Sequence, residues 1–319
     1  MDELTRNEAR PHDGRPGSLG ELIHSAVRRA IEVAVDEELT TAVGMRPYER
    51  GRGRRTGGTP PTLGRTDMKS LVSALTKLVA GAMLIGATTA HAAEIKVIAS
   101  AAVKEAVFEL IPAFEKASGH KVTMIWAGTE AITKRISGGE VVYIVLIAAP
   151  NIEKLIAEGK LVAGSRADVA KSGIGVAVRA GLPAPDISSG EAVKNAVLAA
   201  TSVAYSSGPS GFYLADLFKK MGIADQIKDK VKQTPSGVQV GEVVARGEAD
   251  LGFQQVSELL HLKGIQYLGP LPADIQQITV FSAGLHTLAP MPAAAKALTK
   301  FLTAPEAAPV IRRSGMEPG

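Results

Sequence analysis

Small and hydroxyl residues occur at four points where a predicted strand gives way to a predicted helix. Backbone N–H groups in the first turn of a helix lack intrahelical partners, and the helix dipole favours negative charge beside them. Small residues let a ligand approach these groups, so such junctions can hold an anion without Lys or Arg. Helix capping alone is the alternative at each of them. The junctions are residues 100–102, 128–130, 206–211 and 235–237.

The third junction reads SSGPSG and exceeds what a helix cap requires, because two glycines flank Pro209 and Ser210. We therefore expect a ligand contact there. In open α/β sheets such junctions lie at the carboxyl ends of strands, where ligands commonly bind.

Recognisable catalytic patterns are absent from the sequence. The chain has no Cys, which excludes a thiol nucleophile, a disulfide and a cysteine-ligated metal site. His120, His261 and His286 lie far apart without metal-ligand spacing, and no GxSxG, GxxxxGK[ST] or HExxH pattern occurs. We therefore expect a binding protein rather than an enzyme, with no cofactor and no metal except within an oxyanion ligand.

Alternating strand and helix patterns form the scaffold that must position these junctions. Residues 93–172 read as strand–helix repeats, which predicts a mostly parallel sheet covered by helices on both faces. Residues 173–268 form a second set, and 269–319 return toward the first. The prediction is an α/β protein of two lobes, with the ligand in the cleft between them.

The first 92 residues differ in character from the rest. Residues 68–92 contain, in order, a lysine, a short apolar run and the sequence AHA, which are the three parts of a cleavable secretory signal. Residues 1–67 contain eleven Arg and no Lys, whereas Lys outnumbers Arg by seventeen to six from Ala93 onward. We interpret 1–67 as a leader of different origin, with Met68 as the alternative start, and 68–92 as a signal peptide.

Residues 1–57 resemble the N-terminal segment of mutator-type transposases, with helical periodicity over 19–43 and a basic Gly/Pro-rich tail. The acidic catalytic core of those enzymes does not follow, so transposition is not implied. The eleven Arg of residues 1–67 are balanced by eleven Asp and Glu, and residues 93–319 have a net charge of only +2. The pI of about 9.2 therefore gives no reason to expect nucleic-acid binding by the mature domain.

Residues 93–319 resemble the periplasmic molybdate-binding proteins of ABC transporters. The resemblance implies a periplasmic-binding-protein-like fold and a periplasmic, monomeric receptor. Such a receptor closes on a small anionic ligand, delivers it to an inner-membrane ABC permease, and catalyses nothing. The segments that carry it are VIASAAVKEAV (97–107), AGTEAITKRISGGE (127–140), GPSGFY (208–213), VVARGEADLGF (243–253) and the closing 294–319.

Several ligand positions of that family differ here. Ala102 replaces a serine, Glu130 replaces a hydroxyl residue, Gln255 replaces a tyrosine, and Tyr143 replaces an aspartate. Carried over residue by residue, the expected ligand-binding positions are Ala101, Ala102, Thr129, Glu130, Ser207, Ser210, Gly211, Gly237, Gln254 and Gln255.

These differences leave three functions open. The first is a receptor for a molybdate-type or tungstate-type oxyanion. The second is a receptor for a small organic di- or tricarboxylate, for which Lys104 or Lys134 could supply positive charge. The third is an enzyme on the same scaffold.

Overall fold

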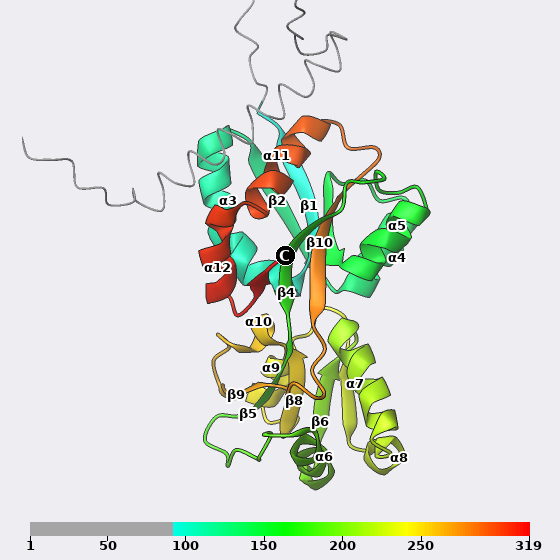
Figure 1. Ribbon diagram of the computed structural model, residues 1–319, viewed down its shortest axis with the longest axis vertical. Coiled ribbons are helices and arrows are strands. Elements are labelled where there is room, and N and C mark those ends of the chain that lie inside the picture. The colour runs from blue at the N-terminus through cyan, green and yellow to red at the C-terminus, as the bar shows by residue number, and fades with distance from the viewer. Residues whose placement is uncertain (1–91) are drawn as a thin grey trace, which may run out of the picture. The chain divides into compact units, whose positions relative to one another are not determined.

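The computed structural model describes residues 92–319, and every structural statement below concerns that part of the chain (Figure 1). The predicted leader at 1–67, and all of the predicted signal peptide at 68–92 except Ala92, lie outside the described residues.

The described residues contain two β-sheets. The first has the strand order β11-β4-β10-β3-β1-β2, and the second has the order β7-β6-β8-β5-β9. The strands of the first sheet are β1 (Glu94–Ser100), β2 (Lys121–Ala127), β3 (Ile144–Ala148), β4 (Ala167–Ser172), β10 (Thr279–Leu285) and β11 (Glu317–Pro318). The strands of the second are β5 (Ile174–Arg179), β6 (Val203–Ser206), β7 (Val231–Thr234), β8 (Leu251–Gln255) and β9 (Ile265–Pro270).

Helices flank both sheets, and each sheet with its helices is called a lobe below (Figure 1). The first lobe contains η1 (Ala101–Val103), α3 (Lys104–Ser118), α4 (Thr129–Ser137), α5 (Ala149–Ala157), α11 (Pro292–Leu302), η2 (Pro305–Ala307) and α12 (Ala308–Arg313). The second contains α6 (Gly190–Ala199), α7 (Pro209–Lys220), α8 (Ala224–Ile227), α9 (Val240–Ala245) and α10 (Val256–Leu259).

Each lobe has a hydrophobic core on both faces of its sheet. In β1, Val97 faces the cluster that includes Phe114 of α3 and Phe301 of α11. The next residue, Ile98, faces the opposite cluster, which includes Ile132 of α4. Strand side chains alternate between faces, so a strand covered on both sides must be apolar throughout, and β3 is buried at every position. The second lobe likewise has separate clusters on its two faces.

The α/β fold with two sheets flanked by helices agrees with the sequence prediction, but the sheets are mixed rather than mostly parallel. Parallel pairing is confined to β1, β2 and β3 in the first sheet and to β6, β7 and β8 in the second. The strands next to the crossings, β4 and β10 in one sheet and β5 and β9 in the other, pair antiparallel. Strand β4 leaves the first lobe at the crossing and β10 enters it there, so these two strands run in opposite directions, and β5 and β9 do the same in the second lobe.

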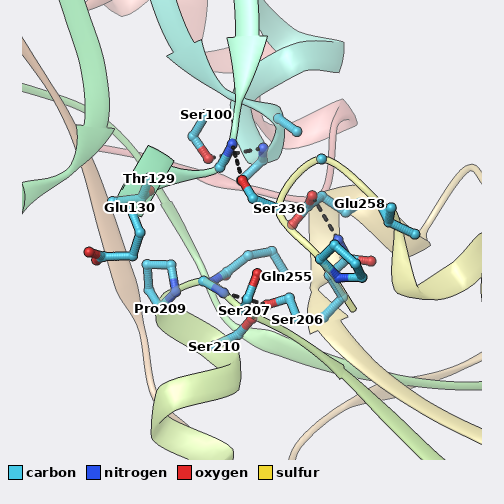
Figure 2. A pocket seen from close by; sticks show the side chains of 18 of the residues that line it. Ser100, Thr129, Glu130, Ser206, Ser207, Pro209, Ser210, Ser236, Gln255 and Glu258 are labelled. Carbon is cyan, nitrogen blue, oxygen red and sulfur yellow. Dashed lines mark hydrogen bonds between the residues drawn. The ribbon is translucent and has the colours of Figure 1, made fainter. Parts of the chain in front are cut away.

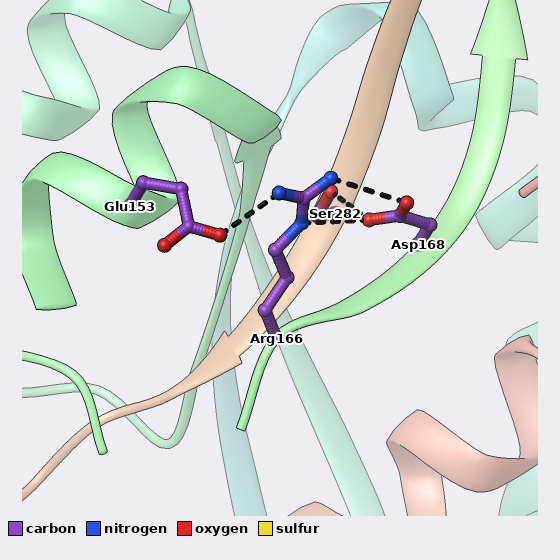
Figure 3. A network of polar contacts seen from close by, with 4 residues as sticks. All are labelled: Glu153, Arg166, Asp168 and Ser282. Carbon is purple, nitrogen blue, oxygen red and sulfur yellow. Dashed lines mark hydrogen bonds and ion pairs between the residues drawn. The ribbon is translucent and has the colours of Figure 1, made fainter. Parts of the chain in front are cut away.

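An ion-pair network supports the first sheet where the chain enters β4 (Figure 3). The guanidinium of Arg166 donates two hydrogen bonds to Asp168, at 2.8 and 3.1 Å, and a third to Glu153 of α5 at 2.8 Å. The fully buried hydroxyl of Ser282 in β10 donates to Asp168 at 2.6 Å. Two carboxylates thus hold Arg166, and the network as a whole joins α5, β4 and β10.

Candidate functional site

A small polar pocket lies where strand ends from both sheets meet (Figure 2). Its lining comes from the ends of β1, β2, β6, β7 and β8 and from the residues that follow them. The four predicted junctions therefore meet at one site. None of the residues lining it is Lys or Arg, so backbone N–H groups, hydroxyls and amides are the donors that the described part of the chain offers a ligand here.

The hydroxyl of Thr129 is the clearest sign of a missing ligand. Thr129 is the first residue of α4, is 1% exposed and lines the pocket, yet its Oγ1 has no hydrogen-bond partner. An unpaired buried hydroxyl costs free energy unless something bonds to it. The N-terminus of the nine-residue α4 adds free N–H groups beside it, so this corner of the pocket suits an anion.

The β6–α7 junction forms a second donor corner. Glycine at 208 and Pro209 at the first turn start the helix, and the hydroxyls of Ser206 and Ser210 lie 3.1 Å apart. Gly211 does not line the pocket. A Cβ on it would lie 1.6 Å from the carbonyl oxygen of Ser206, so glycine is what allows α7 to approach β6.

A hydrogen bond between Gly128 and Ser236 joins the two lobes at the pocket. The backbone N–H of Gly128, in the first lobe, donates to the hydroxyl of Ser236, in the second, at 3.2 Å. A Cβ at Gly128 would lie 2.5 Å from that hydroxyl, so the contact requires glycine. The Ser236 hydroxyl thus accepts from an N–H at the start of α4, a group that would otherwise be free to bond to a ligand.

A carboxyl group faces the pocket from α10, on the side opposite Thr129 and Glu130 (Figure 2). The Gln254 amide nitrogen donates to Oε1 of Glu258 at 2.8 Å, and its oxygen accepts from the backbone N–H of Val240 at 2.8 Å, which fixes the orientation of the amide. Glu258 is half-buried and lines the pocket. Desolvation raises its pKa to about 7, although the Gln254 hydrogen bond acts in the opposite direction.

Gln255 lines the pocket, but its amide is engaged at the two crossings between the sheets. It lies 3.0 Å from the hydroxyl of Thr279, the first residue of β10. With the amide oxygen accepting from Thr279, its nitrogen donates at 3.2 Å to the oxygens of Ser172 and Gly173, where β4 gives way to β5. Gln255 therefore ties both crossings together.

Glu130 lies on the rim of the pocket. Its carboxylate accepts a hydrogen bond from Asn151 at 3.1 Å and also lines a neighbouring cavity of about 530 Å³. The other charged or aromatic candidates do not line the pocket. Lys104 lies over the ring of Phe108, Lys134 is exposed in the last turn of α4, and Tyr143 packs against the first-lobe core.

Of the ten predicted positions, nine line the pocket: Ala101, Ala102, Thr129, Glu130, Ser207, Ser210, Gly237, Gln254 and Gln255. Sequence reasoning missed Glu258, because it assigned no helix after β8. The signal available in the sequence was a carboxylate, Glu258, three residues after the end of the buried strand β8.

In the part of the chain that the structure describes, no cluster of His, Cys, Asp and Glu suits a metal ion. Nor does any helix there have the length and apolar character needed to cross a membrane.

Two mixed sheets, two crossings and a polar pocket between them define the class of two-lobed binding proteins that enclose a small ligand. The chain belongs to the bacterial extracellular solute-binding protein family, whose model matches residues 95–317.

Relatives of two kinds match the chain. A Pseudomonas protein named aconitate isomerase is 38% identical over 254 residues, which cover 76% of this chain and 97% of that protein. A protein of Azotobacter vinelandii named molybdate-binding protein ModA is 29% identical over 235 residues, or 72% of this chain and 92% of its own length. The solved periplasmic molybdate-binding protein of Azotobacter vinelandii has a TM-score of 0.61 at 22% identity, covering 70% of this chain and 98% of that one, and shares the fold.

Proposed function

We propose that this chain is an exported solute-binding protein whose pocket takes a small unsaturated polycarboxylate of the aconitate type and isomerises it. The observation that carries the binding part is the unpaired, buried Thr129 hydroxyl at the start of α4, in a pocket whose other donors are hydroxyls and backbone N–H groups. Carboxylate oxygens accept hydrogen bonds from such donors.

The chemistry of the pocket is compatible with a carboxylate ligand. Glu258 and Glu130 both line it, and an ionised carboxylate there repels any anionic ligand that lies against it. A carboxyl with a pKa of about 7, as in Glu258, is protonated in part of the molecules at neutral pH and can then donate a hydrogen bond to a ligand carboxylate.

The comparisons support the same assignment. The relative named aconitate isomerase is 38% identical and matches along 97% of its length, whereas the Azotobacter vinelandii relative named molybdate-binding protein is 29% identical. Because the first alignment is both longer and closer, aconitate is the substrate that we propose for this chain.

Export and partners follow from the family. We infer that residues 68–92 direct the mature part to the periplasm, where it acts as a monomer without nucleic acid. In a receptor role the ligand-bound protein would dock on an ABC permease. The sequence-based expectation of a receptor without catalysis remains the alternative, and isomerisation of aconitate distinguishes the two.

The binding part is tested by calorimetry of the purified protein with cis-aconitate, trans-aconitate, citrate and molybdate. We expect binding of the tricarboxylates and none of molybdate. Thr129→Val should weaken binding about 10-fold or more, because a hydrogen bond to a charged group contributes about 1.5–3 kcal/mol. The matched control is Thr299→Val in α11, away from the pocket, which should leave the affinity unchanged.

The catalytic part is tested by following cis- and trans-aconitate with proton NMR in the presence of the protein. Interconversion that depends on protein concentration is the expected result. Binding without interconversion would leave a tricarboxylate receptor. Tight binding of molybdate with none of aconitate would favour the second candidate, a molybdate receptor, which the 29% identical relative and the shared fold support.

A further inference from the structure

We infer that Glu258 is the group that removes and returns the proton when the bound polycarboxylate isomerises, with Gln254 as its positioning residue. The inference rests on the proposed function and assigns a catalytic residue within the same pocket. Among the residues lining the pocket, the side chains that carry a carboxyl group are Glu258 and Glu130. Their surroundings differ.

The chemistry of the ligand sets what the residue must do. The two isomers of aconitate differ in the geometry about a double bond that lies next to a methylene group. One route to the other isomer breaks a methylene C–H bond and forms an O–H bond on a protein carboxylate. The allylic electron pair shifts the double bond, and the carboxyl O–H, whose proton can exchange with solvent, then gives a proton that forms a C–H bond at the far end. Nothing is oxidised or reduced, and the carboxylate is regenerated.

A second route would add a nucleophile to the double bond, allow rotation and then eliminate it. Thiolates suit that reaction, but the chain contains no Cys. The serines of the pocket have no histidine among the lining residues to activate them. Proton transfer by a carboxyl is therefore the route that the pocket residues support.

Glu258 is held where such a transfer requires it. It lies on α10, directly after Ser257, whose hydroxyl donates to the backbone carbonyl of Ala102 in the first lobe at 2.7 Å. That bond fixes α10 against η1, and Gln254 fixes one oxygen of the carboxyl at 2.8 Å. Glu258 lines the pocket with its carboxyl held in this way.

Little charge surrounds this carboxyl. Helix α10 packs against η1, β5, β8 and β9. Charged or titratable groups on or beside these elements are Lys104, which lies over Phe108, Arg179 at the far end of β5, and Tyr267 of β9. Asp250 directly precedes β8 and bonds to Thr201, and Lys263 precedes β9. His261 follows α10 and bonds to the carbonyl of Arg313. Among the described residues no ion pair holds Glu258 ionised, and burial raises its pKa to about 7, near the value at which a general base works best at neutral pH.

Glu130 lacks these features. Its carboxylate lies on the rim, is bonded to Asn151 and opens onto the second cavity. The donors around Thr129 lie across the pocket from Glu258 (Figure 2). A ligand whose carboxylates bind there would direct its remaining atoms toward α10. The same donors would stabilise the charge that develops on a ligand carboxylate as the proton leaves.

The experiment compares the wild-type protein with Glu258→Gln, Glu258→Asp and Glu130→Gln, with Glu191→Gln on the exposed face of α6 as the matched control. Each is assayed for binding of cis- and trans-aconitate by calorimetry, for isomerisation by NMR, and for deuterium incorporation into the ligand in D2O.

We expect Glu258→Gln to bind within about tenfold of wild type and to lose 100-fold or more of both isomerisation and exchange. Glu258→Asp should recover part of the loss. Wild-type kcat/KM should rise with pH to a plateau above about 7, and the residual activity of Glu258→Gln should lack that rise.

Three results would overturn the assignment. The first is isomerisation by Glu258→Gln within threefold of wild type. The second is a loss of activity in Glu130→Gln that matches or exceeds the loss in Glu258→Gln at equal binding. The third is a wild-type protein that binds aconitate but neither isomerises it nor exchanges its protons. A wild-type protein that binds no aconitate would instead refute the proposed function itself, so the binding arm separates the two failures.

Discussion

At the scale of single residues, the pocket combines two groups that a folded protein normally avoids. Thr129 keeps a buried hydroxyl without a partner, and Glu258 keeps a carboxyl in surroundings that oppose its ionisation. Both arrangements destabilise the ligand-free protein. Such costs at a cleft between lobes are typical of residues kept for binding or chemistry rather than for stability.

The raised pKa of Glu258 predicts how stability depends on pH. In the unfolded chain the group ionises near its ordinary value, whereas in the folded protein its pKa is about 7. The folded state therefore binds more protons between these values, and stability falls as pH rises through this window. Glu258→Gln removes the titration. We expect the difference in free energy of unfolding between variant and wild type to change by about 1–3 kcal/mol, in favour of the variant, between pH 4.5 and 8.

Urea denaturation of both proteins at several pH values measures that difference. Glu191→Gln serves as the control for replacing a glutamate by glutamine, because its carboxylate is exposed on α6. A Glu258→Gln difference from wild type that does not change with pH would contradict the raised pKa.

At the scale of elements, the close approach of α7 to β6 sets the second donor corner of the pocket. Gly211→Ala would place a methyl group 1.6 Å from the carbonyl oxygen of Ser206. Because backbone cannot yield as a side-chain tip can, α7 has to move. We expect a loss of about 1–3 kcal/mol in the free energy of unfolding, together with weaker ligand binding because Ser206 and Ser210 move apart.

Gly208→Ala is the matched control for stability. It adds the same methyl group three residues earlier, where the nearest heavy atom would lie 3.6 Å away, an ordinary contact distance. Urea denaturation should therefore show a much smaller change than for Gly211→Ala. Equal losses in the two variants would mean that the close approach of α7 is not the cause.

At the scale of the whole molecule, the Gly128–Ser236 hydrogen bond links the lobes in the absence of ligand. A bond of this kind contributes about 1 kcal/mol, enough to change the ratio of closed to open molecules about fivefold. We expect Ser236→Ala to give a larger radius of gyration than wild type in ligand-free solution, measured by small-angle X-ray scattering, with the two values converging once ligand closes the cleft.

Ser137→Ala is the control for that measurement, because Ser137 bonds to Glu158 at 2.5 Å on the surface of the first lobe, far from the crossing strands. Its radius of gyration should match that of wild type. Identical scattering from all three ligand-free proteins would show that the Ser236 bond does not hold the lobes together.

The alternation of strands and helices, the two sheets and the polar junctions were all predictable from the sequence. Helix α4 begins directly after Gly128 and buries Ile132 and Ile136, which lie four residues apart on one face. Helix α3 stops before Gly119, which has φ of +73°. These features depend on neighbours three or four positions apart, so local periodicity and capping determine them. The predicted pocket positions follow from the same rule, because strand ends and helix starts are local signals.

Tertiary structure decided the rest. Short strands such as β7 and β9 were not predicted, and the sheets proved mixed, because strand direction depends on partners far along the chain. The bond from Gly128 to Ser236, separated by 108 residues, and the placement of the Gln255 amide at both crossings carry no local signal. Glu258 is an ordinary glutamate in the sequence. Its raised pKa comes from the protein that the fold brings around α10, since desolvation depends on the whole surrounding volume rather than on adjacent residues.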